Sequence, residues 1–389
     1  MKIPRILSIM LVLLLALPML FGCAGDSADV IKIGVISPLT GDVAVYGNAV
    51  YEAVQLYVEQ FNKAGGIGGK KIKLIAYDDK GDATEAVNAY NRLVSSDNVV
   101  AIIGPVTSTP TLSVAEQSVA DNVPMITGTA THPAVTTYGK NFFRACFEDP
   151  FQGGAIARFA ADYLKAASGA IIYNTSDAYS TGLKDSITAT ANEIGFTLTA
   201  TEGYAKGDVD FRSQLTNIIE TNPDVLFIPE YYQNAYIICK QARELGFTGT
   251  FLGVDGTDGI LEMEGVDPSI VEGMYFANHF AVDSTDPDVI QFVADYNAKY
   301  GKNPNALAAL GYDAAKILVN AIKTVIENGG EGFEITNSAE HRQAIIDALA
   351  ATELDCVTGN ITFDENRNPI KECVIIQIKD GANQFVANY

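Results

Sequence analysis

The 389-residue chain contains no tryptophan and only three histidines and five cysteines. The missing indole argues against a sugar-binding protein, because such sites often stack a pyranose ring on tryptophan. His132, His279 and His341 show no metal-ligand spacing, so we expect neither a metal site nor a cofactor. The cysteines form no CxxC pair and no dense pattern, which excludes a fold built on disulfides.

Positive charge is also scarce, because 26 Lys and Arg residues face 47 Asp and Glu residues. Nucleic acid is therefore not an expected partner, since its recognition needs a basic surface. The chain has neither a GxSxG nor a GxxxxGK[ST] motif. The stretch "GGIGG" at 65–69 lies between an expected helix and a strand, the wrong order for a dinucleotide-binding loop. We interpret it as a helix end followed by a turn.

The sequence has one long apolar run at its beginning, from Ile6 to Leu20. It is shorter than the roughly 20 residues of a membrane span, and it ends in "LFGC", which resembles a bacterial lipoprotein signal. We expect 1–22 to be a signal peptide, Cys23 to carry a lipid anchor, and 23–29 to be a linker. An ordinary signal peptide with an incidental cysteine is the alternative. Either reading places the protein outside the cytoplasm, at the cell surface or in the periplasm.

The rest of the chain alternates short apolar strands with polar loops and amphipathic helices. This alternation predicts an α/β fold with parallel sheets covered by helices on both faces. The pattern occurs in two halves of similar size, which predicts a protein of two lobes. The strands are expected at 31–37, 71–79, 99–103, 124–128, 169–174, 196–204, 224–230, 250–256 and 273–280. Residues 357–381 predict a hairpin with its turn at 364–369. A Cys356–Cys373 pair is possible there, and free buried thiols are the favoured alternative.

Ligands of an open parallel sheet bind beyond the carboxyl ends of its strands. In the first half these loops offer hydroxyl groups, backbone amides and helix N-termini, which suit a carboxylate. In the second half they offer aromatic rings and two carboxylates, which suit an ammonium group. A ligand with one charge of each sign is a zwitterion, and an α-amino acid is the simplest candidate. The candidate residues are Tyr46, Ser108, Thr129, Thr131, Tyr179, Glu230, Tyr231 and Asp255.

Each candidate also has a purely structural interpretation. Ser108 could cap the helix that follows Pro110, and Asp255 could form a turn with Gly256. The two threonines could simply solubilise a loop. The tyrosines could pack at the surface or at the cleft rim. Glu230 could form a salt bridge across the lobes or bind the ammonium group.

Several loops resemble, in order and spacing, those of periplasmic leucine/isoleucine/valine-binding proteins, the amino-acid branch of the type I solute-binding proteins of ABC transporters. The similar segments include "GVISPLTGDVAVYG", "IIGPVTSTPT", "MITGTATHP", "FRACFEDPFQG", "FIPEYYQNA" and "TFLGVDG", and the resemblance covers 30–378. It implies that Ser108, Thr129 and Thr131 hold a ligand carboxylate and that Asp255 holds the ammonium. It also implies that Tyr46, Tyr179 and Tyr231 line the cleft. The family usually has Glu at the Asp255 position, so we expect the reach of this side chain and the ligand specificity to differ from those of the family.

The resemblance further implies a two-lobe type I periplasmic binding protein, each lobe a parallel sheet flanked by helices. We expect lobe 1 at 30–149 and 278–355, lobe 2 at 150–277 and 356–389, and crossings near 147–150, 277–281 and 355–358. The expected function is capture of a branched-chain or small aliphatic amino acid by a monomer, for delivery to ABC permease subunits, with no enzymatic step. Alternatives are a binder of amides, urea or aromatic acids, or an amino-acid amide hydrolase that pairs Ser108 with His132.

Overall fold

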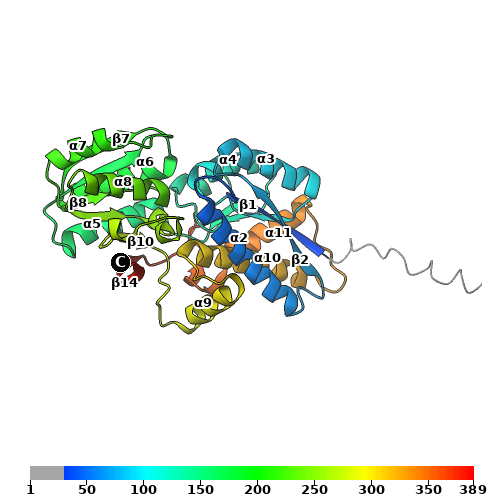
Figure 1. Ribbon diagram of the computed structural model, residues 1–389. Coiled ribbons are helices and arrows are strands. Elements are labelled where there is room, and N and C mark those ends of the chain that lie inside the picture. Colours follow the sequence, from blue (N-terminus) through cyan, green and yellow to red (C-terminus); the bar gives the residue numbers. More distant parts are fainter. Residues whose placement is uncertain (1–29) are drawn as a thin grey trace, which may run out of the picture.

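The computed structural model describes residues 30–389, and the predicted signal peptide, Cys23 and linker lie outside this range. The described chain forms two α/β lobes that lie side by side (Figure 1). Within 30–389, no helix combines the length and the apolar character needed to cross a membrane.

Lobe 1 is built on five parallel strands in the order β2-β1-β3-β4-β5. Alternate residues of β1 point to opposite faces: Ile33 and Val35 pack with α2 and α10, whereas Ile36 packs with α3 and α4. The strands are β1 (Val30–Ser37), β2 (Lys71–Asp78), β3 (Ala101–Ile103), β4 (Met125–Thr127) and β5 (Phe142–Arg144). The helices are α2 (Ala44–Lys63), α3 (Ala83–Arg92), α4 (Ser108–Ser118), α9 (Pro287–Tyr300), α10 (Ala306–Gly329) and α11 (Ala339–Ala350).

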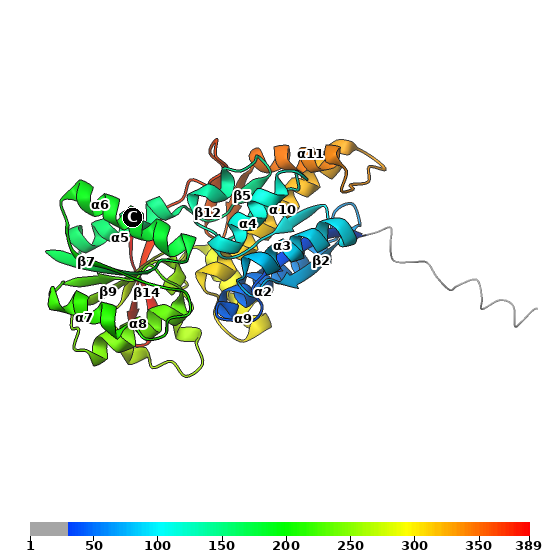
Figure 2. The ribbon, with the colours of Figure 1, turned by 90° about the horizontal axis from the view of Figure 1, so that it is seen from above.

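Lobe 2 is built on seven strands in the order β14-β13-β10-β9-β8-β6-β7, of which β13 and β14 run antiparallel to their neighbours. Helices α5 and α6 cover one face of this sheet and α7 and α8 the other (Figure 2). The strands are β6 (Ser168–Asn174), β7 (Thr197–Tyr204), β8 (Val225–Phe227), β9 (Thr250–Gly253), β10 (Tyr275–Asn278), β13 (Val374–Lys379) and β14 (Ala382–Asn388). The helices are α5 (Asp149–Asp162), α6 (Ala178–Ile194), α7 (Arg212–Glu220) and α8 (Tyr232–Glu244).

The chain passes between the two lobes three times: between β5 and α5, between β10 and α9, and between β12 (Gly359–Thr362) and β13. The third connection corrects two predictions. Strand β12 (Gly359–Thr362) pairs with β11 (Glu353–Cys356), and β13 pairs with β14, so the predicted hairpin joined the wrong strands. A tight turn does occupy 364–368, where the Asp364 N–H donates to the Asn368 carbonyl at 2.9 Å.

A buried carboxylate explains why the third connection comes late. Asp313 of α10 accepts hydrogen bonds from the N–H groups of Val357 at 2.8 Å and Thr358 at 2.9 Å. These bonds fasten the β11–β12 hairpin to lobe 1. The predicted boundary at 356 and the crossing at 355–358 are therefore too early, because the chain leaves lobe 1 only after β12.

Four elements were not predicted, namely β5, α11, β11 and β14. Strands β5 and β11 have only three and four residues, too few for a period-2 pattern to emerge. The stretch at 65–69 behaves as predicted, because α2 ends at Lys63 and turn residues follow. There Gly66 has φ +68°, and a Cβ would lie 2.1 Å from the Lys70 carbonyl oxygen. Within the described range Cys146, Cys239, Cys356 and Cys373 are buried free thiols.

Candidate ligand-binding site

A cavity lies between the lobes, at the carboxyl ends of the parallel strands. Six of the eight predicted site residues line it, and the full lining is Tyr46, Val106, Thr107, Ser108, Thr129, Tyr179, Tyr231, Asp255, Gly256 and Leu307. Its volume is about 20 Å³, room for about one water molecule. In this closed arrangement an amino acid fits only after the lobes or the tyrosine rings move.

On the lobe 1 side, the N-terminus of α4 faces the cavity. The N-cap residue Thr107 makes no side-chain capping bond, and Ser108 is the first residue of the helix, so Ser108 is not the cap. The Ser108 hydroxyl accepts a hydrogen bond from the His132 N–H at 3.4 Å, which leaves its own proton available to a ligand. A helix N-terminus beside a free hydroxyl donor suits an anion.

The two predicted threonines differ in their hydroxyl groups. Thr129 Oγ1 donates to the Val106 carbonyl at 2.6 Å, so its proton is already in use and the side chain serves as cavity wall. Thr131 Oγ1 is fully buried and has no hydrogen-bond partner among residues 30–389. Thr131 is not among the residues that line the cavity, so its hydroxyl reaches a ligand there only if the side chain or the lobes move.

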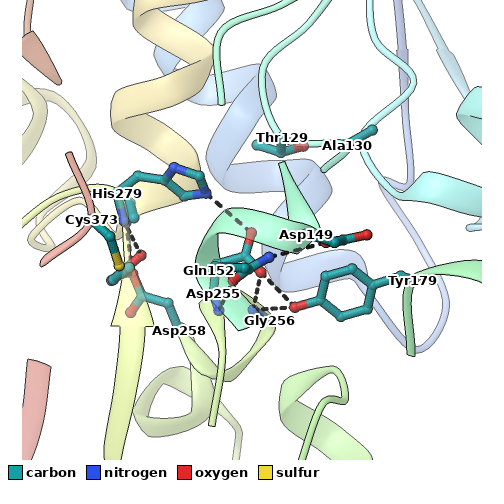
Figure 3. A network of polar contacts seen from close by, with 12 residues as sticks. Thr129, Ala130, Asp149, Gln152, Tyr179, Asp255, Gly256, Asp258, His279 and Cys373 are labelled. Carbon is teal, nitrogen blue, oxygen red and sulfur yellow. Dashed lines mark hydrogen bonds and ion pairs between the residues drawn. The ribbon is translucent and has the colours of Figure 1, made fainter. Parts of the chain in front are cut away.

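On the lobe 2 side, Asp255 starts a single 3-10 turn immediately after β9. Its Oδ1 accepts hydrogen bonds from the Tyr179 hydroxyl at 2.5 Å and from the Gly256 N–H at 3.0 Å. Its Oδ2 lies 3.2 Å from His279 Nε2 (Figure 3). The hydrogen bond from Gly256 corresponds to the local turn that the sequence analysis gave as the structural interpretation of Asp255. The other two contacts come from distant elements and fix the carboxyl group at the cavity.

Three tyrosines form the aromatic part of the wall. The rings of Tyr179 and Tyr231 stack with centroids 4.8 Å apart and planes 4° from parallel. The Tyr46 ring meets Tyr231 edge-on at 5.8 Å. Burial raises the pKa of each of these hydroxyl groups well above its usual value, so all three stay neutral. The Tyr46 hydroxyl also joins the lobes, because it donates to the Gly256 carbonyl and accepts from the Tyr232 N–H at 3.1 Å.

The structure does not bring Glu230 to the cavity. Its carboxyl group accepts hydrogen bonds from the Tyr204 hydroxyl and, at 2.8 Å, from the Tyr231 N–H. Burial raises the pKa of Glu230 to about 7, and the bond from Tyr204 opposes this rise. Glu230 therefore belongs to a hydrogen-bond network inside lobe 2, and neither of its predicted roles has support.

Three polar residues behind Asp255 were not predicted as part of the site. The side-chain oxygen Oε1 of Gln152 accepts a hydrogen bond from the Asp255 N–H at 3.2 Å, and Nε2 of Gln152 donates to Asp149 Oδ1 at 3.1 Å (Figure 3). Burial raises the pKa of Asp149 to about 8. The signal for this pair was the "DPFQ" spacing, which puts both side chains on one helix face. His279 had no comparable signal.

No group of three His, Cys, Asp or Glu side chains in the described part of the chain is arranged to hold a metal ion. The site therefore consists of hydrogen-bond donors and the Tyr46 ring in lobe 1, and of a carboxyl group and the rings of Tyr179 and Tyr231 in lobe 2. This arrangement suits a small molecule with one charge of each sign.

Comparison with known proteins matches residues 30–383 to the family model for periplasmic binding proteins. A Leu/Ile/Val-binding protein of Rhizobium johnstonii is 33% identical over 337 residues, which cover 86% of this chain and 88% of the relative. The crystal structure of a leucine-binding protein of Thermotoga maritima is 35% identical with a TM-score of 0.83, covering 92% of this chain and 98% of that one. A branched-chain amino-acid transporter substrate-binding protein of Streptococcus pneumoniae, solved with isoleucine, is 29% identical with a TM-score of 0.83, covering 92% and 99%. The chain therefore belongs to the periplasmic binding protein family and has the two-lobe fold of its type I members.

Proposed function

We propose that this protein is the substrate-binding component of an ABC transporter and captures an amino acid with a branched-chain or small aliphatic side chain. The observation that carries the proposal is the two-sided cavity, with the N-terminus of α4 and Ser108 on one side and Asp255 on the other. The relatives named as leucine-, isoleucine- and valine-binding proteins support the same ligand class. Permease subunits in the membrane would receive the loaded form. The protein would act as a monomer, because one chain supplies both sides of the cavity, and sedimentation analysis tests this.

Binding and lobe closure are expected to act together. The ligand carboxylate accepts bonds from Ser108, Thr131 and the first amides of α4, and its ammonium group donates to Asp255. Closure then brings the lobes into contact, for example through the Thr109 hydroxyl, which donates to Asp177 Oδ2 at 3.1 Å. Water leaves the cavity as the lobes close, and each charged hydrogen bond becomes stronger in the drier surroundings.

The alternative functions have less support from the site. A ligand without an ammonium group, such as an aromatic acid, would leave the buried Asp255 carboxylate without a cationic partner. A hydrolase would need a base for Ser108. The His132 side chain does not serve that purpose, because its Nδ1 accepts the Ala134 N–H at 3.2 Å and its backbone N–H is the group that contacts Ser108. We therefore propose binding without catalysis.

The test compares two ligands that differ only in the amino group, L-leucine and 4-methylpentanoic acid, by isothermal titration. Asp255→Asn keeps the shape of the side chain and removes its charge. We expect it to weaken leucine binding by about 2–5 kcal/mol and to affect the deaminated acid much less. Asp185→Asn, on the exposed surface of α6, is the control and should change neither affinity. Equal losses for both ligands would show that Asp255 does not receive the ammonium group.

We also propose that the mature chain is a lipoprotein anchored through Cys23 outside the cytoplasm, on the basis of the "LFGC" stretch. Replacing Cys23 with Ser should abolish acylation and release the protein from membranes. Metabolic labelling with a fatty acid, followed by fractionation, measures both effects. A wild-type protein that carries no label and remains in the medium would contradict the anchor.

A further inference from the structure

His279 connects the segments between the lobes to the cavity. It follows directly after β10, where the chain begins its return to lobe 1. Its imidazole ring is fully buried and stacks on Phe147, with ring centroids 3.6 Å apart. Phe147 lies on the first connection, between β5 and α5. The ring is therefore held between two of the three connecting segments, and stacking leaves it little freedom to rotate.

The hydrogen bonds of the ring determine which nitrogen carries the proton. Burial lowers the pKa of His279 to about 4, against the opposing effect of the Asp255 carboxylate, so the imidazole is neutral near pH 7. Nδ1 has no hydrogen-bond partner within the described residues. A proton on Nδ1 would leave the Nε2 lone pair facing a carboxylate oxygen. The Nε2–H tautomer avoids this repulsion and donates to Asp255 Oδ2 at 3.2 Å.

The two oxygens of Asp255 are therefore held from opposite sides. Tyr179 and the Gly256 amide hold Oδ1, and His279 holds Oδ2. A carboxylate accepts about four hydrogen bonds, so about one position remains for a ligand. Figure 3 shows the His279 ring and the Tyr179 ring on either side of this group.

We propose that His279 is a positioning residue that orients the Asp255 carboxylate toward the ammonium group of the ligand. Without the hydrogen bond from His279, the Asp255 side chain would be less ordered. Part of the binding free energy would then be spent on ordering this side chain when the ligand binds. Because His279 acts through Asp255, its effect is confined to ligands that carry the ammonium group. This inference rests on the proposed function, in which Asp255 is the partner of that group.

Three substitutions separate positioning from packing. His279→Gln keeps an amide donor at the reach of Nε2, whereas His279→Asn is one methylene shorter and cannot reach Asp255. His279→Phe keeps a ring to stack on Phe147 and removes the donor. We expect the Asn and Phe variants to bind leucine about tenfold more weakly and 4-methylpentanoic acid with nearly unchanged affinity. The Gln variant should recover most of the leucine affinity.

Thermal denaturation shows whether each variant is folded. If the Phe variant is unfolded, the two ligands are compared on the Asn and Gln variants alone. In an Asp255→Asn background, His279→Asn should cause no further loss of leucine affinity. The positioning role would be overturned if the His279 variants lost affinity equally for both ligands while Asp255→Asn weakened leucine binding alone. That result would leave the proposed function intact. Equal losses for both ligands with Asp255→Asn itself would overturn the proposed function.

Discussion

Buried carboxyl groups near the cavity differ in their hydrogen-bond partners. Glu230 and Asp149 have pKa values raised by burial to about 7 and about 8, so each is partly or mostly protonated near neutral pH. Asp255 has three hydrogen-bond donors around its carboxyl group. The proposed ligand-binding group of Asp255 is therefore linked through Gln152 to Asp149, whose pKa burial raises to about 8.

The raised pKa of Glu230 predicts that this residue lowers the folding stability of the wild-type protein in a pH-dependent way. Between the usual value of 4.5 and the folded value of about 7, the native state binds more protons than the unfolded state, so this group lowers stability as pH rises through that window. Glu230→Gln removes the titration. We expect its unfolding free energy, relative to wild type, to increase from pH 4.5 to pH 7.5 by up to about 3 kcal/mol.

Urea unfolding of both proteins at several pH values measures this difference. The matched control is Glu193→Gln, which removes an exposed glutamate of α6 and should leave the pH dependence as it is in wild type. Curves for Glu230→Gln and wild type that stay parallel over the whole range would contradict the prediction.

Ser108 gives a second prediction at the scale of single residues. Ser108→Ala removes the free hydroxyl donor at the start of α4, and leucine affinity should fall by about 1–3 kcal/mol, as for a hydrogen bond to a charged group. Leucine methyl ester should lose much less, since it presents no full negative charge. Ser113→Ala in the same helix, whose hydroxyl bonds only to the Thr109 carbonyl, serves as control for helix stability. Titration calorimetry decides the point, and the prediction is wrong if acid and ester lose equally.

The positions of Ser108 and Asp255 were predictable because strand ends in a parallel sheet share one edge. The directions of other side chains were not. Thr129 donates to Val106 and Glu230 pairs with Tyr204, and nothing in the local sequence signals either partner. These contacts join groups from different parts of the chain that only the completed fold brings together.

At the scale of elements, α2 and α10 approach each other closely on one face of the lobe 1 sheet. A Cβ added at Gly311 of α10 would lie 2.8 Å from the Val50 carbonyl oxygen and 2.9 Å from its Cα. Both are backbone atoms of α2, which cannot move without shifting the helix. The glycine therefore sets the separation of the two helices.

We expect Gly311→Ala to lower the unfolding free energy by about 1–3 kcal/mol, because overpacking outweighs the gain in helix propensity. Gly154→Ala in α5 is the matched comparison, since its Cβ would meet only the Thr190 hydroxyl at 3.4 Å. That change should be neutral or stabilise by up to about 1 kcal/mol. Chemical denaturation of the two variants measures both values, and similar effects at the two glycines would refute the packing argument.

The parallel strands and their helices were predictable, because strands buried on both faces read as continuous apolar runs. The C-terminal strands were not, since β11, β12 and β13 are short and any two could form a hairpin. Asp313, more than 40 residues earlier in the chain, selects the pairing by binding the Val357 and Thr358 amides. Such a contact has no counterpart in local periodicity.

At the scale of the whole molecule, the lobes are held together by contacts that involve no ligand. The Tyr46 hydroxyl from α2 contacts Gly256 and Tyr232 in lobe 2. The Asp258 carboxylate accepts the Ala306 N–H at the start of α10 at 2.8 Å. The closed arrangement is therefore stabilised by the protein itself.

Tyr46→Phe removes the first of these contacts and should shift the ligand-free protein toward an open form with a larger radius of gyration. Saturating leucine should return the variant to the wild-type value. Tyr300→Phe also loses a tyrosine-to-carbonyl bond, but this bond lies within lobe 1, so the radius should not change. Small-angle X-ray scattering measures all three proteins. Identical radii for the ligand-free wild type and the Tyr46 variant would contradict a role for Tyr46 in closure.

The small size of the cavity has a kinetic consequence. With about 20 Å³ between closed lobes, a ligand can enter only during the intervals when the lobes part or the tyrosine rings move aside. Capture is then gated: the encounter rate is multiplied by the fraction of time spent open, and the observed binding rate reaches a plateau set by opening as the ligand concentration rises. The gate slows every ligand by the same factor, so it changes the speed of uptake without changing which amino acid is chosen.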